Sequence, residues 1–83
     1  MEIKVLYTEE FKSDIRKVKD KMVQVRLKKL VQKLKDNPEI GKPLKYELSG
    51  FRSVRLPPFR ILYELRDGLL VLHKFDHRER VYT

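Results

Sequence analysis

The fold of this 83-residue chain is decided by residues 51–75, FRSVRLPPFRILYELRDGLLVLHKF. Two pairs of turn-forming residues divide this stretch into three runs with the composition of strands. Asp67-Gly68 is the strongest short signal for a β-hairpin, and Pro57-Pro58 belongs in a connection because proline cannot donate to a ladder. The stretch therefore predicts strands near residues 51–56, 60–65 and 69–75, and a further strand is expected just before them, near residues 44–48.

The residues before this stretch predict a short strand and two helices. Residues 2–7 alternate as a strand does, and Thr8 then offers an N-cap hydroxyl to a helix that we expect to end near residues 19–21. The second helix ends before Pro38, because the residue preceding a proline is biased away from helical geometry. Its apolar residues fall on one stripe: Val23, Leu27, Leu30, Val31 and Leu34.

Together these elements predict an α+β domain. An N-terminal strand is followed by a helical hairpin and a four-strand antiparallel meander, with the helices packed on one face of the sheet. A chain of this length forms one domain, so residues 1–83 are expected to fold as a single unit.

The chain is strongly basic, with 20 Lys and Arg against 12 Asp and Glu and a net charge of +8. This charge favours a polyanionic partner, although a solvated charged surface is the alternative interpretation. There is no cysteine, no secretory signal pattern at the N-terminus and no apolar run long enough to cross a bilayer. We therefore expect a cytoplasmic protein without a membrane partner.

Several kinds of catalytic site lack their parts in this sequence. His73 and His77 would lie about 13 Å apart along a strand, without a cysteine pair or an acidic cluster to complete a metal site. The three glycines form no phosphate-binding loop, and no serine stands in a nucleophile-elbow context. We expect no metal and no cofactor.

The strand region carries an unusual number of arginines. Placing Val54, Leu56 and Ile61 against the helices leaves Arg55 and Arg60 side by side on the other face. Such a pair can clamp a phosphate and stabilise the charge that develops on it, because the planar guanidinium matches phosphate oxygens. The alternative is a solvated face on which arginines pair with glutamates such as Glu64 or Glu79.

The pattern resembles the RelE/ParE superfamily, the toxins of type II toxin–antitoxin modules. The resemblance is carried by Gly50, by VRLPPFRILYEL in the centre and by HRERVY near the end, in an order and spacing that span the whole chain. It implies the RelE-like fold and an antitoxin that wraps the toxin. We expect this antitoxin to be acidic. RelE-type members cleave mRNA in the ribosomal A site without a metal, by attack of the ribose 2′-hydroxyl on the adjacent phosphate.

The resemblance also implies roles for individual residues. Arg60 matches the arginine that holds the scissile phosphate, and Tyr82 matches a stacking or proton-transferring tyrosine. Ser53 stands where other members carry a lysine, and His77 is a candidate to replace the missing base. The expected catalytic residues are Arg55, Arg60, Arg78, Tyr82 and His77, and the expected RNA-binding residues are Lys45, Arg52, Ser53 and Arg80.

Two functions remain open within this superfamily. One is a ribosome-dependent mRNA endoribonuclease, whose partners are the ribosome and mRNA. The other is a non-catalytic toxin that binds DNA gyrase, as ParE-type members do, or an inactive homologue. The sequence leaves the oligomeric state undetermined.

Overall fold

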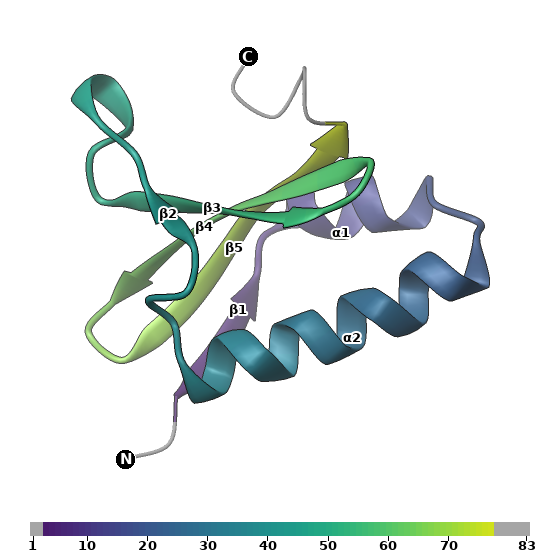
Figure 1. Ribbon diagram of the computed structural model, residues 1–83, viewed down its shortest axis with the longest axis horizontal. Coiled ribbons are helices and arrows are strands. Elements are labelled where there is room, and N and C mark those ends of the chain that lie inside the picture. The colour runs from purple at the N-terminus through teal and green to yellow at the C-terminus, as the bar shows by residue number, and fades with distance from the viewer. Residues whose placement is uncertain (1–2, 78–83) are drawn as a thin grey trace.

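A computed structural model describes residues 3–77 and contains a five-stranded sheet with two helices on one face (Figure 1). The strands lie in the order β1-β5-β4-β3-β2. This arrangement confirms the predicted α+β class. The elements in chain order are β1 (Lys4–Tyr7), α1 (Glu9–Arg16), α2 (Lys21–Asp36), β2 (Lys42–Pro43), the 3₁₀ turn η1 (Tyr46–Leu48), β3 (Phe51–Leu56), β4 (Phe59–Arg66) and β5 (Leu69–His77).

Both helices begin at the side-chain caps that the sequence provides. The Thr8 hydroxyl accepts a hydrogen bond from the Phe11 amide at 3.1 Å, and the Asp20 carboxylate accepts one from the Met22 amide at 2.9 Å. Helix α1 ends at Arg16, a few residues before the predicted end. The amides of the next two residues bond to the carbonyls three positions back, which tightens the last turn and ends the α-helical ladder.

The two hairpins of the meander are built as the turn residues predict. Leu56 pairs with Phe59 across the two prolines, and Arg66 pairs with Leu69 across Asp67-Gly68. Asp67 and Gly68 both have positive φ, at 51° and 77°, as a type I′ turn requires. The three predicted strands of this region are therefore confirmed as β3, β4 and β5.

The strand predicted near residues 44–48 is wrong. The strand that pairs with β3 is the two-residue β2, and part of the predicted segment forms η1 instead. Tyr46 has a φ of 59°, which is left-handed and incompatible with a strand. Alternation of apolar residues in this segment suggested a strand, but the pairing stops soon after Pro43, where the Leu44 amide makes one last bond to Phe51.

Strands β1 and β2 form the two opposite edges of the sheet. Strand β1 runs parallel to β5, with Val5 opposite Leu70 and Tyr7 opposite Leu72. The N-terminal strand thus pairs with the C-terminal strand of the described chain, and the helical hairpin carries the chain across to the far edge. None of the helices in residues 3–77 is long and apolar enough to span a membrane.

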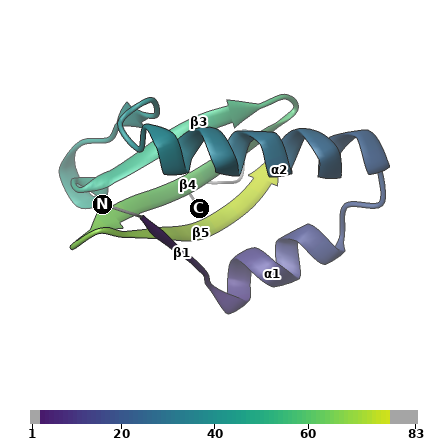
Figure 2. The same cartoon turned by 90° about the horizontal axis from the view of Figure 1, so that it is seen from below.

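The core lies between the sheet and the two helices. Helix α2 crosses in front of β3 and β4 in Figure 2, whereas α1 lies below β5 and packs against it. The largest fully buried side chains come from both layers: Phe11, Leu34, Ile61, Tyr63, Leu70 and Leu72. Ile61 and Tyr63 alternate with Arg60 and Leu62, so β4 presents one face to the core and the other away from the helices.

Tyr63 fastens the loop after α2 to the sheet. Its hydroxyl donates to the Pro38 carbonyl at 2.7 Å and accepts from the Gly41 amide at 3.0 Å. Arg52 holds the same loop by donating to the carbonyls of Glu39 and Gly41, at 3.1 Å and 2.8 Å. Burial raises the pKa of the Tyr63 phenol above its ordinary value of 10.0, so the group stays a hydrogen-bond donor.

Candidate functional site

The side of the sheet turned away from α1 and α2 carries the candidate site, and we call it the open face. The strand register shows which side chains lie on it. Successive residues of a strand point to opposite faces, and paired residues of neighbouring strands point to the same face. The side chains that face this way include Phe51, Ser53, Arg55, Arg60, Leu62, Glu64, Arg66, Val71, His73 and Asp76, of which Asp76 lies directly opposite Arg60.

Arg55 and Arg60 lie directly opposite each other on β3 and β4. The short connection at Pro57-Pro58 fixes this register, so two guanidinium groups start from adjacent backbone positions at one end of the open face. The sequence predicted this neighbourhood from alternation alone, and the structure confirms the placement.

Ser53 anchors the Arg60 guanidinium. One Arg60 Nη1–H donates to the Ser53 Oγ at 3.0 Å, and the Ser53 side chain is almost completely buried. No carboxylate within residues 3–77 forms an ion pair with Arg55 or Arg60. The remaining guanidinium donors are therefore available to an external anion. The alternative interpretation paired Arg60 with Glu64, and Glu64 instead contacts Arg66 and His73.

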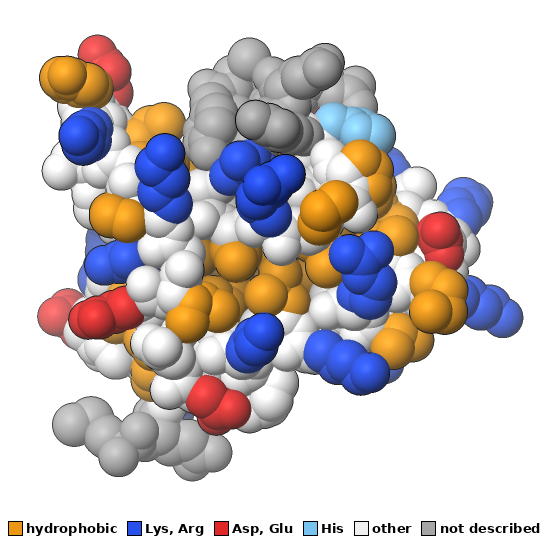
Figure 3. Space-filling view, in the orientation of Figure 1, with side chains coloured by type: hydrophobic (Ala, Val, Ile, Leu, Met, Phe, Trp, Pro, Cys, Tyr) orange, Lys and Arg blue, Asp and Glu red, His pale blue; other side chains and the backbone are white. Residues whose placement is uncertain are grey.

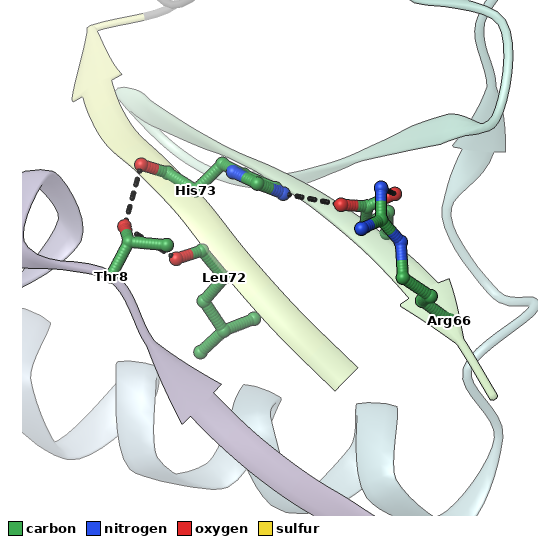
Figure 4. A network of polar contacts seen from close by, with 5 residues as sticks. Thr8, Arg66, Leu72 and His73 are labelled. Atoms are coloured by element: carbon green, nitrogen blue, oxygen red, sulfur yellow. Dashed lines mark hydrogen bonds and ion pairs between the residues drawn. The ribbon is translucent and has the colours of Figure 1, made fainter. Parts of the chain in front are cut away.

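Glu64 and His73 form a pair that the sequence interpretation missed (Figure 4). The His73 Nε2 lies 2.8 Å from the Glu64 Oε1, and the Arg66 guanidinium lies 3.5 Å from the other oxygen of the same carboxylate. The edge of the His73 ring meets the Phe51 ring at a centroid distance of 5.0 Å. A histidine, a carboxylate and the two arginines therefore share the open face.

A β-bulge explains why spacing along the sequence did not reveal this pair. The register between β4 and β5 shifts at Leu62 and Tyr63, which face Lys74 and Leu72, so His73 has no direct partner in the ladder. Alternation counted from Phe75 places His73 on the core side, whereas the extra residue moves it to the open face. A bulge of this kind has no sequence signal as clear as Asp67-Gly68.

Two of the expected site residues lie away from the two arginines. Arg52 points to the helix side and holds the loop near Gly41, as described above. The His77 ring stacks on Phe59 at 4.9 Å, and the Phe59 ring in turn packs on the core residue Phe75 at 4.7 Å. His77 is therefore on the core side of the sheet, opposite to the face that carries Arg55 and Arg60, and its expected catalytic role stays a prediction.

The other expected residues are peripheral or outside the described part. Lys45 is exposed in the loop before η1, and Ser53 acts as the anchor of Arg60. Arg78, Arg80 and Tyr82 lie outside the described residues.

Positive charge is prominent over the surface seen in Figure 3. Lys and Arg side chains surround a recess with a hydrophobic floor between the sheet and α2, and the visible Asp and Glu side chains lie toward the edges of the view. Helix α2 adds to this charge with six basic residues against one acidic residue. The basic surface thus extends well beyond the two arginines.

Comparison with known families now identifies the chain. Residues 5–82 match the profile of the ParE toxin of type II toxin–antitoxin systems, parDE. The chain belongs to this toxin family. It is therefore a toxin of a toxin–antitoxin module and a member of the RelE/ParE superfamily, as the sequence resemblance implied.

Solved structures show the same fold. One chain of the RelBE2 toxin–antitoxin complex from Mycobacterium tuberculosis is 28% identical to the present chain, with a TM-score of 0.81. The match covers 94% of the present chain and 100% of the RelBE2 chain. The RelB–RelE complex of Methanococcus jannaschii matches with a TM-score of 0.75 at 18% identity, covering 93% and 94% of the two chains.

A further structure, YafQ from E. coli, matches with a TM-score of 0.72 at 22% identity and covers 98% of this chain and 99% of that one. Two of these three similar structures contain an antitoxin, which supports an antitoxin as a partner of this toxin. No curated protein matches the sequence.

Proposed function

We propose that this toxin is an endoribonuclease that cleaves mRNA in the A site of the ribosome and so inhibits translation. The observation that carries this proposal is the Arg60 guanidinium, which is anchored by Ser53, faces Arg55 and has no carboxylate partner within residues 3–77. A cation held in this way suits a phosphodiester whose charge rises during the reaction. The similarity to RelE and YafQ structures gives secondary support.

In the proposed reaction the ribose 2′-hydroxyl attacks the adjacent phosphorus, and the bond to the 5′-oxygen of the next nucleotide breaks. Arg60 binds a non-bridging oxygen of the scissile phosphate, and Arg55 adds positive charge from the neighbouring strand. Family resemblance assigns Arg78 and Tyr82 to the same site, with Arg80 as an RNA contact. Such a reaction needs no metal ion, because the arginines supply the charge that stabilises the pentacoordinate phosphate.

The family match itself favours a second candidate. The profile that matches residues 5–82 is that of ParE toxins, and ParE-type members bind DNA gyrase. In that case the basic surface serves binding alone, to the acidic antitoxin we propose as the partner or to another polyanion. The two candidates make opposite predictions for mRNA.

The first test adds purified toxin to a reconstituted translation reaction and maps the mRNA by primer extension. We expect cuts at A-site codons that are absent on naked mRNA and are lost in Arg60→Ala. The matched control is Arg26→Ala, which removes an exposed arginine from α2 and should keep the cleavage pattern.

Thermal unfolding and antitoxin binding of both variants establish that they are folded. Intact mRNA at high concentrations of the unaltered toxin would overturn the ribonuclease proposal, and inhibition of gyrase supercoiling would then support the second candidate. Cleavage at full rate by Arg60→Ala would show that the phosphate is held elsewhere.

A further inference from the structure

The ribonuclease reaction needs a group that removes the proton of the 2′-hydroxyl, and the arginines cannot do so because they stay protonated. Lysine is absent at position 53, and His77 lies on the core side of the sheet. The open face does carry an imidazole, on His73, beside the Glu64 carboxylate.

The His73 side chain is placed by the β-bulge and by Thr8. The Thr8 hydroxyl donates to the carbonyl oxygens of Leu72 and His73, at 2.9 Å and 3.1 Å, in the segment where the β4–β5 register shifts. Figure 4 shows these bonds on one side of β5 and the imidazole–carboxylate contact on the other. Bulges commonly re-aim a side chain at functional sites, and this one turns His73 away from the core.

The ring reaches across β4 to the end of β3 that lies away from the Pro57-Pro58 connection, and the Arg60 side chain extends toward it from the other end. The imidazole contacts Glu64 on β4 and meets the ring of Phe51 on β3 at 5.0 Å. The Arg60 guanidinium is held over the same strand by Ser53. Phe51 and Ser53 are alternate residues of one strand face, about 6–7 Å apart. The imidazole, which meets Phe51, and the guanidinium, which bonds to Ser53, therefore lie over neighbouring positions of one face of β3.

The contact with Glu64 also selects the reactive nitrogen of His73. In the neutral ring, the Nε2–H donates to the Glu64 oxygen, so the Nδ1 carries the lone pair. Within the part of the chain that the structure describes, Nδ1 has no hydrogen-bond partner. The His73 side chain is 29% exposed and Glu64 is 13% exposed, so a substrate can reach the ring while the carboxylate stays largely shielded.

We propose that His73, oriented by Glu64, is the general base of the cleavage reaction, an assignment that rests on the ribonuclease function proposed above. The His73 Nδ1 takes the proton of the 2′-hydroxyl as the 2′-oxygen forms its bond to phosphorus. The bond from phosphorus to the 5′-oxygen breaks, and the leaving oxygen takes a proton from water. Glu64 stabilises the imidazolium that forms, which then returns its proton to solvent.

The charged groups around the ring are consistent with this role. Glu64 faces it from β4, with Arg66 bound to the far side of the same carboxylate. Arg60 lies on the same face of β4, opposite Asp76 of β5. Lys74 follows His73 in β5 and pairs with Glu10 of α1. Strand β1 contributes Leu6 beside Val71, an uncharged neighbour.

The test is single-turnover cleavage on mRNA-programmed ribosomes between pH 5.5 and 8.5. The variant His73→Gln keeps a donor for Glu64 but cannot accept a proton. We expect its rate to fall by about 10²–10⁴-fold, while antitoxin binding and thermal unfolding stay unchanged. The rate of the unaltered toxin should rise with pH across the range in which imidazole loses its proton and then level off, and His73→Gln should lose this rise.

The matched control is Gln24→Ala, which changes an exposed side chain of α2 and should retain both the rate and its pH dependence. A second variant, Glu64→Gln, keeps a hydrogen-bonding side chain but removes the charge that stabilises the imidazolium. It should lower the rate of the chemical step with little effect on ribosome binding.

The outcomes separate this assignment from the function on which it rests. Suppose that the unaltered toxin cleaves mRNA, and that His73→Gln cleaves it within about threefold of that rate and with the same pH dependence. The general base is then another group, and only the assignment of His73 fails. If the unaltered toxin leaves mRNA intact, the ribonuclease function fails and the assignment fails with it.

Discussion

At the scale of single residues, Tyr63 shows how much one side chain contributes to this thin core. It is fully buried in the central strand, yet its hydroxyl satisfies a donor and an acceptor of the loop that leads from α2 to β2. Position 41 has no room for a side chain, because a Cβ there would lie 2.7 Å from Cε1 and 2.9 Å from Cζ of the Tyr63 ring. The helical layer and the sheet are thus joined at one phenol.

We predict that Tyr63→Phe lowers the free energy of unfolding by about 1–3 kcal/mol at neutral pH, because the Gly41 amide and the Pro38 carbonyl lose their partner. Since the folded state raises the pKa of this phenol, the stability that it contributes is present below pH 10.0 and is lost as the pH rises further. Urea unfolding from pH 8 to 11 should therefore show a steeper alkaline loss for the unaltered toxin than for Tyr63→Phe. Parallel losses in the two proteins would contradict the assignment.

Single residues also mark what the sequence could and could not predict about the site. Strict alternation placed Arg55 and Arg60 correctly, because the two-residue connection at Pro57-Pro58 fixes their register. His73 could not be placed in this way, because one extra residue in β5 reverses the side to which it points. Its pairing with Glu64 is a consequence of that shift.

At the scale of secondary-structure elements, Thr8 joins three of them. It follows β1, caps α1 and donates to two carbonyls at the bulge of β5. Elements with a side-chain cap or a turn signal were predicted well from sequence, as both helices and the Asp67-Gly68 hairpin show. The segment around Tyr46 was not, because its apolar alternation resembles a strand while the backbone turns through a left-handed residue.

We predict that Thr8→Val lowers the free energy of unfolding by about 1–2 kcal/mol, because it removes the N-cap of α1 and the bonds to the bulge. Thr8→Ser keeps the hydroxyl and serves as the control, with stability close to that of the unaltered toxin. The comparison is made by urea denaturation at neutral pH. Equal stability of the valine and serine variants would show that the hydroxyl contributes little.

At the scale of the whole molecule, charge and topology were predictable to different degrees. The net charge of +8 was evident from composition, and the meander followed from local turn signals. The parallel pairing of β1 with β5 joins residues more than 60 positions apart, and no local pattern encodes such a contact. Family resemblance was needed to choose among the functions that a basic face permits.

We predict that the proposed binding of the toxin to ribosomes weakens steeply with salt, because each phosphate contact releases counterions. A plot of the logarithm of affinity against the logarithm of potassium chloride concentration should be linear with a negative slope. Arg55→Ala should make this slope shallower by about one if the side chain contacts a phosphate. Affinity that does not change with salt would indicate that recognition is not electrostatic.

The pairing of β1 with β5 has a consequence for the moment at which a new toxin molecule becomes active. During synthesis β1 leaves the ribosome first and cannot join the sheet until β5, at residues Leu69–His77, has also emerged. His73 sits in this last strand, and the contacts that orient it join it to Thr8 and Glu64. Chains still attached to the ribosome with β5 inside it therefore cannot assemble the site proposed around His73. The site proposed around His73 can therefore form in each toxin molecule only after β5 has been translated and has left the ribosome.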